Sequence, residues 1–366
     1  MLPRMSGPQT AENATPSDPP LPSDPSPSDP SPSSSPDVVS RRSGALPRFL
    51  IPLVESVWGR LLLCVLSGTL LFLSCADFDI WPLCWIGMVP LLWVLLDDDG
   101  LPRTKNPFFY GMVTGIFANG GGFYWIVGLL QRFGHLPWIA AAPLFLLLVA
   151  YQALTFGLFA LIVCRLRAHI GVKVTWLAPL VWVACELCVP YVFPWYLSIT
   201  QAWVPTVIQI ADITGPLGVS FLLVLSNGAL FDLSQALGRR RARRPREALG
   251  APLIAAATIA LSLIYGVVRI HQVDGARAAA DKVKIGVVQA NVGINEKFVP
   301  GLREQQHELH LRLSQELARQ GAELLVWPES SYPYPMPRPA RRDFPPGDAR
   351  RIHQGFDTPI LFGALT

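Results

Sequence analysis

The amino-acid sequence predicts a polytopic α-helical membrane domain with about seven transmembrane helices, followed by the start of an α/β domain. Three observations support this prediction. Hydrophobic residues make up 51% of the 366 residues and charged residues only 15%, a balance that does not suit an ordinary soluble domain. Most apolar residues lie between Phe49 and Ile270, in blocks long enough to cross a bilayer. After Ile270 the composition becomes that of a soluble protein, with a strand, helix, strand pattern.

The apolar blocks match the thickness of a bilayer core, which needs roughly 20 helical residues at about 1.5 Å each. Glu55 and Arg60 interrupt the first block and Glu186 interrupts the fifth, so the count of seven is open by one helix. We assign positions 48–270 to the membrane domain. The blocks are Phe49–Ala76, Ile80–Leu96, Pro107–Leu130, Pro137–Cys164, Val174–Pro190, Ile213–Phe231 and Ala251–Val268.

Basic residues alternate between the loops, which predicts the orientation in the membrane. The loops expected on the other side hold almost none, with Arg132 as the exception. Because cytoplasmic loops carry the excess of Lys and Arg, the N-terminus is expected in the cytoplasm and everything after Ile270 outside. A nucleic-acid patch would make this alternation a coincidence. The basic loops hold Arg41, Arg42, Arg48, Arg103, Lys105, Arg165, Arg167, Lys173, Arg239, Arg240, Arg241, Arg243, Arg244 and Arg246.

Residues 1–47 are rich in Pro, Ser and Asp, with the phrase PSDP beginning at Pro16, Pro22 and Pro27. Such a segment cannot bury enough apolar surface to offset the entropy lost on ordering. We expect a disordered cytoplasmic tail. It lacks the basic start, apolar core and small-residue cleavage site of a signal peptide.

Positions 281–366 are assigned to the α/β domain. Strands are expected at Lys282–Asn291, Glu323–Pro328 and Pro359–Leu365, with a helix from Gly301 to Gln320 that ends at Gly321. Strand, helix, strand is the pattern of a parallel sheet. Because the sequence stops at Thr366, within or beside the third strand, we expect this domain to be incomplete in this chain.

Glu329 is the first candidate catalytic residue. It follows the second expected strand in the phrase Trp327-Pro328-Glu329-Ser330. Active sites of α/β proteins form at the carboxyl ends of sheet strands, so Glu329 is placed to act as a general base. The alternative is a solvated turn residue.

Three residues of the membrane part are candidates for a substrate or lipid cleft: Glu186, Phe193 and Trp195. An ionisable residue within a transmembrane segment is functional by default, although Glu186 could instead extend to the outer interface. Phe193 and Trp195 belong to an aromatic cluster whose alternative role is the ordinary interfacial belt.

No metal site and no cofactor is predicted. The six histidines lack ligand spacing, and no Gly-rich phosphate loop occurs. Cys185 and Cys188 form a CxxC without a second pair, so we expect buried packing residues. The basic residues are spread over loops, which does not favour a nucleic-acid partner.

The expected strands and the WPES phrase resemble the start of the nitrilase, or carbon-nitrogen hydrolase, domain. The membrane part adds a second resemblance, to the membrane half of apolipoprotein N-acyltransferase, in order and spacing. The resemblance covers about Arg48 to Thr366. It is carried by ADFDIWPLCWIGMVPLLW (76–93), GGFYWI (121–126), Phe133-Gly134, WLAPLVWVACE (176–186), FPW (193–195), Gln201, Gln209, Asp212 and GPLGVSFLLVLSN (215–227).

The resemblance implies a transfer in two steps at a bacterial inner membrane. A cysteine thiolate takes an acyl chain from a phospholipid, and the resulting thioester acylates the α-amine of the S-diacylglyceryl-cysteine of a lipoprotein. In this family the general base is the glutamate of the WPE phrase, which matches Glu329. The family's lysine and cysteine fall later in the domain. No lysine follows Lys297 and no cysteine follows Cys188, so we expect an inactive fragment.

Two alternatives stay open. In a split system, this chain would be the membrane subunit and a second polypeptide would complete the hydrolase domain. An inactive relative would bind lipid or lipoprotein without chemistry. A transporter would explain the helices but not the WPES phrase on an external domain.

Overall fold

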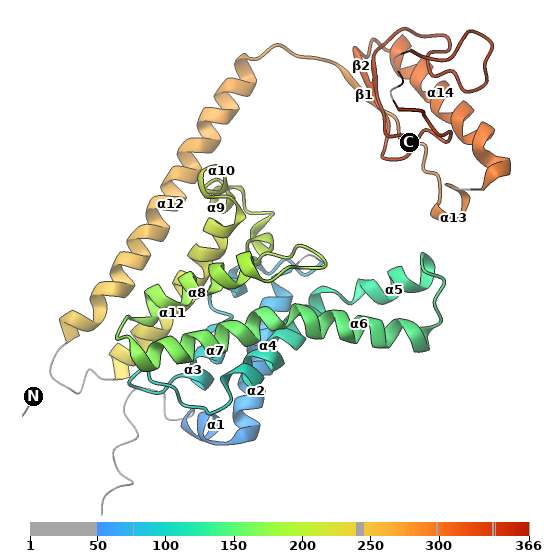
Figure 1. Cartoon of the computed structure of the whole chain (residues 1–366). Helices are drawn as coiled ribbons and strands as arrows, with labels where there is room; N and C mark the ends of the chain where they lie inside the picture. The colour runs from blue at the N-terminus through green and yellow to red at the C-terminus, as the bar shows by residue number, and fades with distance from the viewer. Residues whose placement is uncertain are drawn as a thin grey trace, which may run out of the picture. The chain divides into compact units, whose positions relative to one another are not determined.

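The structure is a computed structural model that describes residues 50–75, 77–238, 245–297, 299–338, 340 and 342–365. The predicted tail at 1–47 lies outside the described residues, as do Arg41, Arg42, Arg48 and the arginines at positions 239–244. The described chain is mostly helical up to Ala279, and a small parallel sheet follows (Figure 1).

Each of the seven apolar blocks contains helix, but several blocks are broken. The first block holds two helices. The second starts as a 3-10 helix and resumes as a short α-helix, and the third bends by 56° between its two helices. The helices are α1 (Ile51–Glu55), α2 (Val57–Leu73), η1 (Trp81–Trp85), α3 (Val89–Leu95), α4 (Pro107–Gly122), α5 (Trp125–Arg132), α6 (Trp138–Gln152), α7 (Leu154–His169), α8 (Val174–Cys188), η2 (Leu197–Gln201), α9 (Pro205–Ile208), α10 (Ala211–Thr214), α11 (Pro216–Gly238) and α12 (Pro245–Ala279).

The lengths of these helices support a membrane domain with fewer full spans than expected. Within the described ranges, three helical stretches are long and apolar enough to cross a bilayer: Trp138–His169, Pro216–Leu237 and Leu249–Ala279. The bent pair of α4 and α5 makes a fourth if it counts as one span. The helices of the first, second and fifth blocks are shorter, and the count of seven stays a prediction.

Small residues bring the helices of the membrane part close together. A Cβ atom added at Gly68 on α2 would lie 2.5 Å from the carbonyl oxygen of Thr114 on α4. One added at Gly115 on α4 would lie 2.8 Å from Cα of Ala153, at the junction of α6 and α7. Since lipid gives no hydrophobic force between helices, close backbone approach through small residues is how such helices pack.

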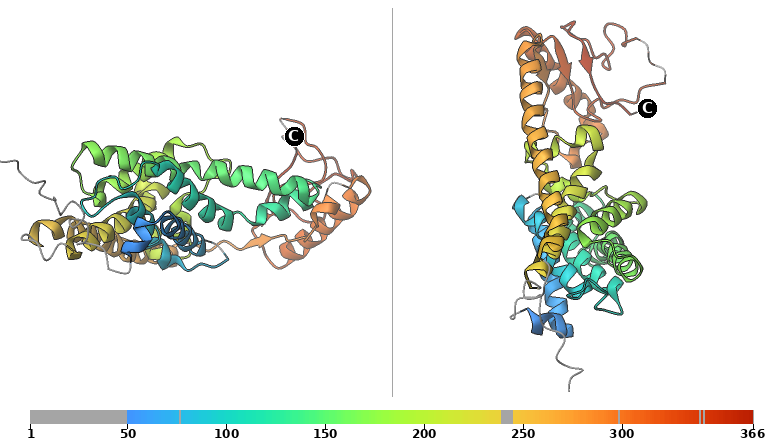
Figure 2. Two further views of the ribbon diagram at one scale, coloured as in Figure 1. Left: turned by 90° about the horizontal axis from the view of Figure 1, so that it is seen from below. Right: turned by 90° about the vertical axis from the view of Figure 1, so that its left-hand side faces the viewer.

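Helix α12 departs from the expected domain boundary. It continues to Ala279, past the predicted end at position 270, and it runs unbroken in the right-hand view of Figure 2. The residues beyond Val268 include Arg269, His271, Asp274 and Arg277. These polar side chains do not end a helix, because Arg is a good helix former and a solvated helix turn tolerates His and Asp. The apolar pattern therefore ended before the helix did.

The α/β part has the expected strand, helix, strand order. Strands β1 (Ile285–Val287), β2 (Leu324–Val326) and β3 (Ile360–Leu361) form a parallel sheet in the order β1-β2-β3. All three are shorter than expected, although flanking residues still bond across the sheet, as in the bond from the N–H of Val288 to the carbonyl oxygen of Val326.

Helix α14 (Arg303–Arg319) connects β1 to β2 and is preceded by α13 (Ile294–Lys297) and η4 (Pro300–Leu302). Gly321 has φ of +83°, the left-handed conformation that ends helices, so the predicted helix end is confirmed. A buried cluster forms the core of this part: Val288, Leu311, Trp327, Tyr332 and Ile352.

Candidate active site

Glu329 lies immediately after β2 and its side chain is exposed. The next residue, Ser330, has φ of +51°, so the chain turns sharply at the end of the strand. The segment after β3 passes close by. A Cβ atom added at Gly363 would lie 2.7 Å from the backbone nitrogen of Ser330 and 3.2 Å from Cα of Glu329. Only glycine lets these two strand ends approach so closely.

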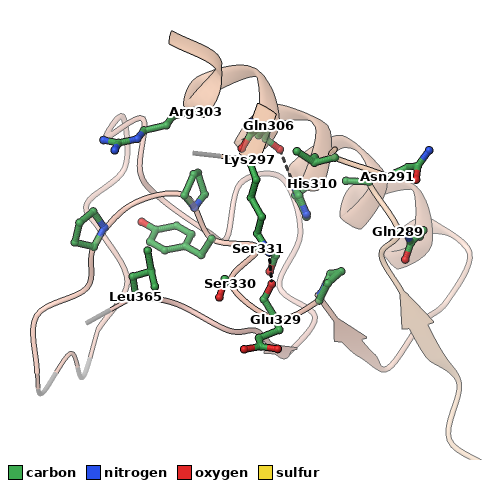
Figure 3. A pocket seen from close by; sticks show the side chains of 16 residues that line it. Gln289, Asn291, Lys297, Arg303, Gln306, His310, Glu329, Ser330, Ser331 and Leu365 are labelled. Carbon is green, nitrogen blue, oxygen red and sulfur yellow. Dashed lines mark hydrogen bonds between the residues drawn. The ribbon is translucent and has the colours of Figure 1, made fainter. Parts of the chain in front are cut away.

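A cavity of about 210 Å³ lies beside Glu329 (Figure 3). Four parts of the chain build it: the residues after β1, the first turns of α14 together with α13, the WPES segment after β2, and Leu365 after β3. The carboxyl ends of parallel strands meet at one edge of a sheet, which is where α/β proteins form ligand sites. The lining residues are Gln289, Ala290, Asn291, Val292, Lys297, Arg303, Gln306, His310, Pro328, Glu329, Ser330, Ser331, Tyr332, Pro333, Pro335 and Leu365.

Lys297 connects α13 to the catalytic candidate. Its Nζ donates a hydrogen bond of 3.0 Å to the backbone carbonyl oxygen of Glu329. Figure 3 shows the carboxylate of Glu329 pointing away from Lys297. The lysine therefore fixes the backbone of the WPES turn, while the carboxylate stays accessible.

The back of the cavity is rigid. The ring of His310 lies 5.0 Å from that of Trp327, centroid to centroid, and its Nδ1 bonds the backbone oxygen of Gln306 at 2.7 Å. Burial lowers the pKa of His310 below its ordinary value, so the ring is neutral at pH 7. The indole Nε1–H of Trp327 donates to Ser314 Oγ at 2.9 Å.

The three cleft candidates of the membrane part lie near the end of α8 and in the connection from α8 to η2. Glu186 is 2% exposed, and its Oε1 accepts a hydrogen bond of 2.6 Å from the backbone N–H of Leu197. The alternative in which Glu186 extends to the interface is therefore wrong. Trp195 is buried, and the half-buried ring of Phe193 lies 5.9 Å from that of Trp125. Their role in binding lipid stays a prediction.

Two further predictions concern metal ligands and the cysteine pair of α8. Within the part of the chain that the structure describes, no group of three or more His, Cys, Asp or Glu side chains is arranged to hold a metal ion. Cys185 is buried as expected, but Cys188 is exposed. It is the last residue of α8, and its exposure shows that the packing prediction was wrong for Cys188.

The sequence pattern singled out Glu329 but not Lys297, His310 and Ser331, which line the same cavity. Lys297 and Ser331 follow the first and second strands, and the rule that parallel strands end at one edge could have indicated both. His310 was harder to find, because its ring lies on the buried face of α14 among residues that read as an ordinary helix.

The helical part and the parallel βαβ unit together define a membrane protein with an appended α/β domain. Residues 67–229 match the family model described as the apolipoprotein N-acyltransferase N-terminal domain. This segment is therefore a domain of that kind, and the chain corresponds to the N-terminal portion of proteins of the apolipoprotein N-acyltransferase family.

Curated relatives agree with this assignment. The chain is 35% identical over 279 residues to the apolipoprotein N-acyltransferase of Geobacter metallireducens, which covers 75% of this chain and 51% of the relative. It is 28% identical over 177 residues to apolipoprotein N-acyltransferase 2 of Leptospira interrogans, with 48% and 29% covered. With the Chlorobaculum tepidum protein the identity is 27% over 316 residues, with 82% and 54% covered. The chain spans about half the length of the curated relatives it matches.

Proposed function

We propose that this chain takes part in the N-acylation of bacterial lipoproteins. An acyl chain would leave a membrane phospholipid, form a thioester with a cysteine, and pass to the N-terminal amine of an S-diacylglyceryl-cysteine. The observation that carries the proposal is the exposed carboxylate of Glu329 at the carboxyl end of β2, beside a cavity. The family match supports the same reaction class.

In this proposal Glu329 is the general base. A thiol must lose its proton before it attacks an ester, and a nearby carboxylate can accept that proton. Glu329 is accessible to such a partner, and the Lys297 contact to its backbone holds the turn in place. The six cysteines lie between positions 64 and 188 and five are buried, so none is assigned as the nucleophile. We expect no acyl transfer by the 366-residue polypeptide alone.

The parallel sheet and the WPES turn support a nitrilase-like α/β domain, and the loop charges support a location outside the cytoplasm. We therefore propose a multi-pass protein of the bacterial inner membrane with seven crossings and a cytoplasmic N-terminus. Its partners are a phospholipid donor and a diacylglyceryl-modified lipoprotein acceptor. Glu186, Phe193 and Trp195 would line or support the lipid cleft. No cofactor is required, because thiol, base and oxyanion stabilisation suffice for acyl transfer.

A chimera tests the reaction. The chain would be joined to the remaining half of a curated relative and expressed in a bacterium depleted of its own lipoprotein N-acyltransferase. Mass spectrometry of a lipoprotein N-terminus should detect the third acyl chain. We expect Glu329→Gln to abolish it and Glu308→Gln, which changes an exposed carboxylate outside the cavity lining, to retain it. Full acylation by the Glu329→Gln chimera would refute the assignment of the base.

Reporter fusions test the orientation independently. A cytoplasmic reporter at the N-terminus and a periplasmic reporter after Ala280 should both be active. Location of both ends in one compartment would contradict an odd number of crossings.

A further inference from the structure

His310 turns one nitrogen of its ring toward the cavity beside Glu329. The residue is 4% exposed and belongs to the cavity lining. Its Nδ1 lies 2.7 Å from the backbone carbonyl oxygen of Gln306. Because a carbonyl oxygen only accepts, Nδ1 carries the proton of the neutral ring, and Nε2 is left as an acceptor. In Figure 3 the ring extends from this bond into the space among the lining residues.

This acceptor nitrogen has no partner in the described part of the chain. The bond to Gln306 is the one hydrogen bond of the His310 side chain there. Burial lowers the pKa of His310, and the nearby charge of Lys297 lowers it too, so the ring keeps its lone pair at pH 7. Buried polar atoms are normally satisfied, because an unpaired one is costly. A ligand that donates a hydrogen bond would satisfy Nε2.

The charges on the lining indicate a donor without charge. Among the described lining residues, Lys297 and Arg303 are cationic and Glu329 is the one carboxylate. That carboxylate points away from Lys297 (Figure 3). Beside these cations an ammonium group is disfavoured relative to the neutral amine. A neutral primary amine donates through an N–H and keeps its lone pair for attack on a carbonyl carbon.

The volume limits how much of a ligand enters. At about 210 Å³, the cavity is smaller than the roughly 300–1,000 Å³ of sites that enclose a whole small-molecule ligand. Pro333 and Leu365 add apolar surface to the lining. The space suits the amine end of a larger molecule, together with the carbon atoms next to the nitrogen.

We propose that His310 binds the α-amine of the acyl acceptor in its neutral form, with Nε2 accepting a hydrogen bond from one N–H. The assignment rests on the proposed function and gives a residue to its second step. In that step the nitrogen lone pair forms the C–N bond, the C–S bond of the thioester breaks, and the proton that nitrogen loses goes to the departing thiolate. The bond to His310 holds the amine in place for this attack.

Nuclear magnetic resonance of the 366-residue chain in detergent tests the amine site without acyl transfer. The probe is S-methylcysteine amide, and its N,N-dimethyl derivative is the matched control, since that amine has a lone pair but no N–H. Both are added at about pH 8.5, above the pKa of roughly 7.7–8.0 of an α-amine. With histidine labelled by ¹⁵N, the Nε2 signal of His310 is identified by its absence in His310→Gln.

We expect the primary amine to shift the Nε2 signal of His310 and the dimethyl amine to leave it in place. No shift with the primary amine, or equal shifts with both amines, would overturn the proposal. His307 provides an internal reference, because it is buried on the same helix outside the lining and its Nε2 lies 3.0 Å from the carbonyl oxygen of Arg351. Its signal should not respond to either amine.

The chimera tests the role of His310 in the reaction, with the thioester and the acylated amine measured separately by mass spectrometry. His310→Phe keeps a ring against Trp327 and removes the acceptor. It should leave thioester formation unchanged and slow transfer to the amine by about threefold to tenfold, the size expected for one hydrogen bond, so the thioester accumulates. His310→Gln places an amide oxygen near the position of Nε2 and should restore part of the rate.

His307→Phe is the matched control for damage to the fold, because it replaces a second buried histidine of α14 outside the lining. It should not change the ratio of the two steps. A His310→Phe variant that slows both steps equally, or neither, would show that His310 has no role in binding the amine.

The two proposals fail separately. If the chimera forms no thioester and the probe still shifts the His310 signal, the reaction assignment falls and the amine site stands. If the chimera acylates lipoprotein at the same rate with His310→Phe, the reaction stands and the amine site falls.

Discussion

The side chain of Asn227 on α11 bonds the backbone of Met88 across 139 positions of sequence. Its Oδ1 accepts the N–H of Met88 at 2.8 Å, and its Nδ2 donates to Cys84 O at 2.9 Å and to Leu223 O at 2.8 Å. Met88 and Cys84 lie on either side of the break between η1 and α3. A bilayer core provides no water to satisfy backbone groups, so this amide makes the broken second block stable.

Asn227→Ala should therefore destabilise the membrane part. The variant leaves a buried N–H and a buried carbonyl oxygen without partners, and we expect a loss of about 2–6 kcal/mol in the free energy of unfolding, at about 1–3 kcal/mol for each unsatisfied group. Thermal unfolding in detergent measures it as a lower midpoint. Thr258→Ala is the control, because that exposed hydroxyl bonds only its own helix, at Ile254 O. An unchanged midpoint for Asn227→Ala would contradict the role of the amide.

The membrane part illustrates what sequence patterns can predict. Each apolar block that hydropathy indicated contains helix, because apolar length is a local property, whereas the short helices η2 and α9 lie outside the blocks. Hydropathy did not predict the break near Met88, because the residues on both sides are apolar and the break depends on a distant asparagine. Nor did it predict that Glu186 is buried, since its partner, the N–H of Leu197, is a backbone group that no residue type reveals.

The candidate site was predicted in part for the same reason. Glu329 stands next to a strand, and strand position is visible in the sequence. Ser331 looks like another turn residue, and only the folded chain shows its hydroxyl to be buried beside a cavity. Predicting His310 would have required knowing how α14 packs against Trp327, and the sequence pattern does not show this packing.

Ser314→Ala should loosen α14 against the sheet. The buried indole N–H of Trp327 would lose its acceptor, and an unpaired buried donor costs about 1–3 kcal/mol. Hydrogen–deuterium exchange of peptides from 303–319 should become faster by about fivefold or more. Gln320→Ala, at an exposed position after the same helix, should leave exchange unchanged. Equal protection in both variants would show that the Trp327 bond adds nothing.

Gly363→Ala should displace the WPES turn. The new methyl group would lie 2.7 Å from Ser330 N, and neither backbone segment can move without breaking the bond from Tyr332 N–H to Gly363 O. In the chimera we expect acylation to fall at least tenfold. A displacement of the general base by about 1 Å can lower the reaction rate on the order of a hundredfold. Gly301→Ala meets nothing within 4 Å and should retain activity. Normal activity in Gly363→Ala would show that the turn tolerates the shift.

The α/β part should lose stability in mild acid. Burial lowers the pKa of His307 and of His310 below their ordinary value of 6.5. The unfolded chain then binds protons more readily than the folded chain, so the contribution of both residues is fully present above pH 6.5 and declines as the pH falls below it.

Exchange of 303–319 peptides, corrected for the intrinsic effect of pH, should show falling protection between pH 7.5 and 5.5, while peptides of α7 stay constant. His310→Gln should reduce the slope. A slope that is unchanged in that variant, or protection that rises in acid, would contradict the assignment.

The bond between Glu186 and Leu197 has a consequence for the aromatic residues that precede it. It fixes the end of the connection, at Leu197, to helix α8. Only the short stretch 189–196 is then left as a loop. A short closed loop has little conformational freedom to lose. Any molecule that touches Phe193 or Trp195 therefore meets a surface ordered in advance, and less of its binding energy is consumed in arranging it.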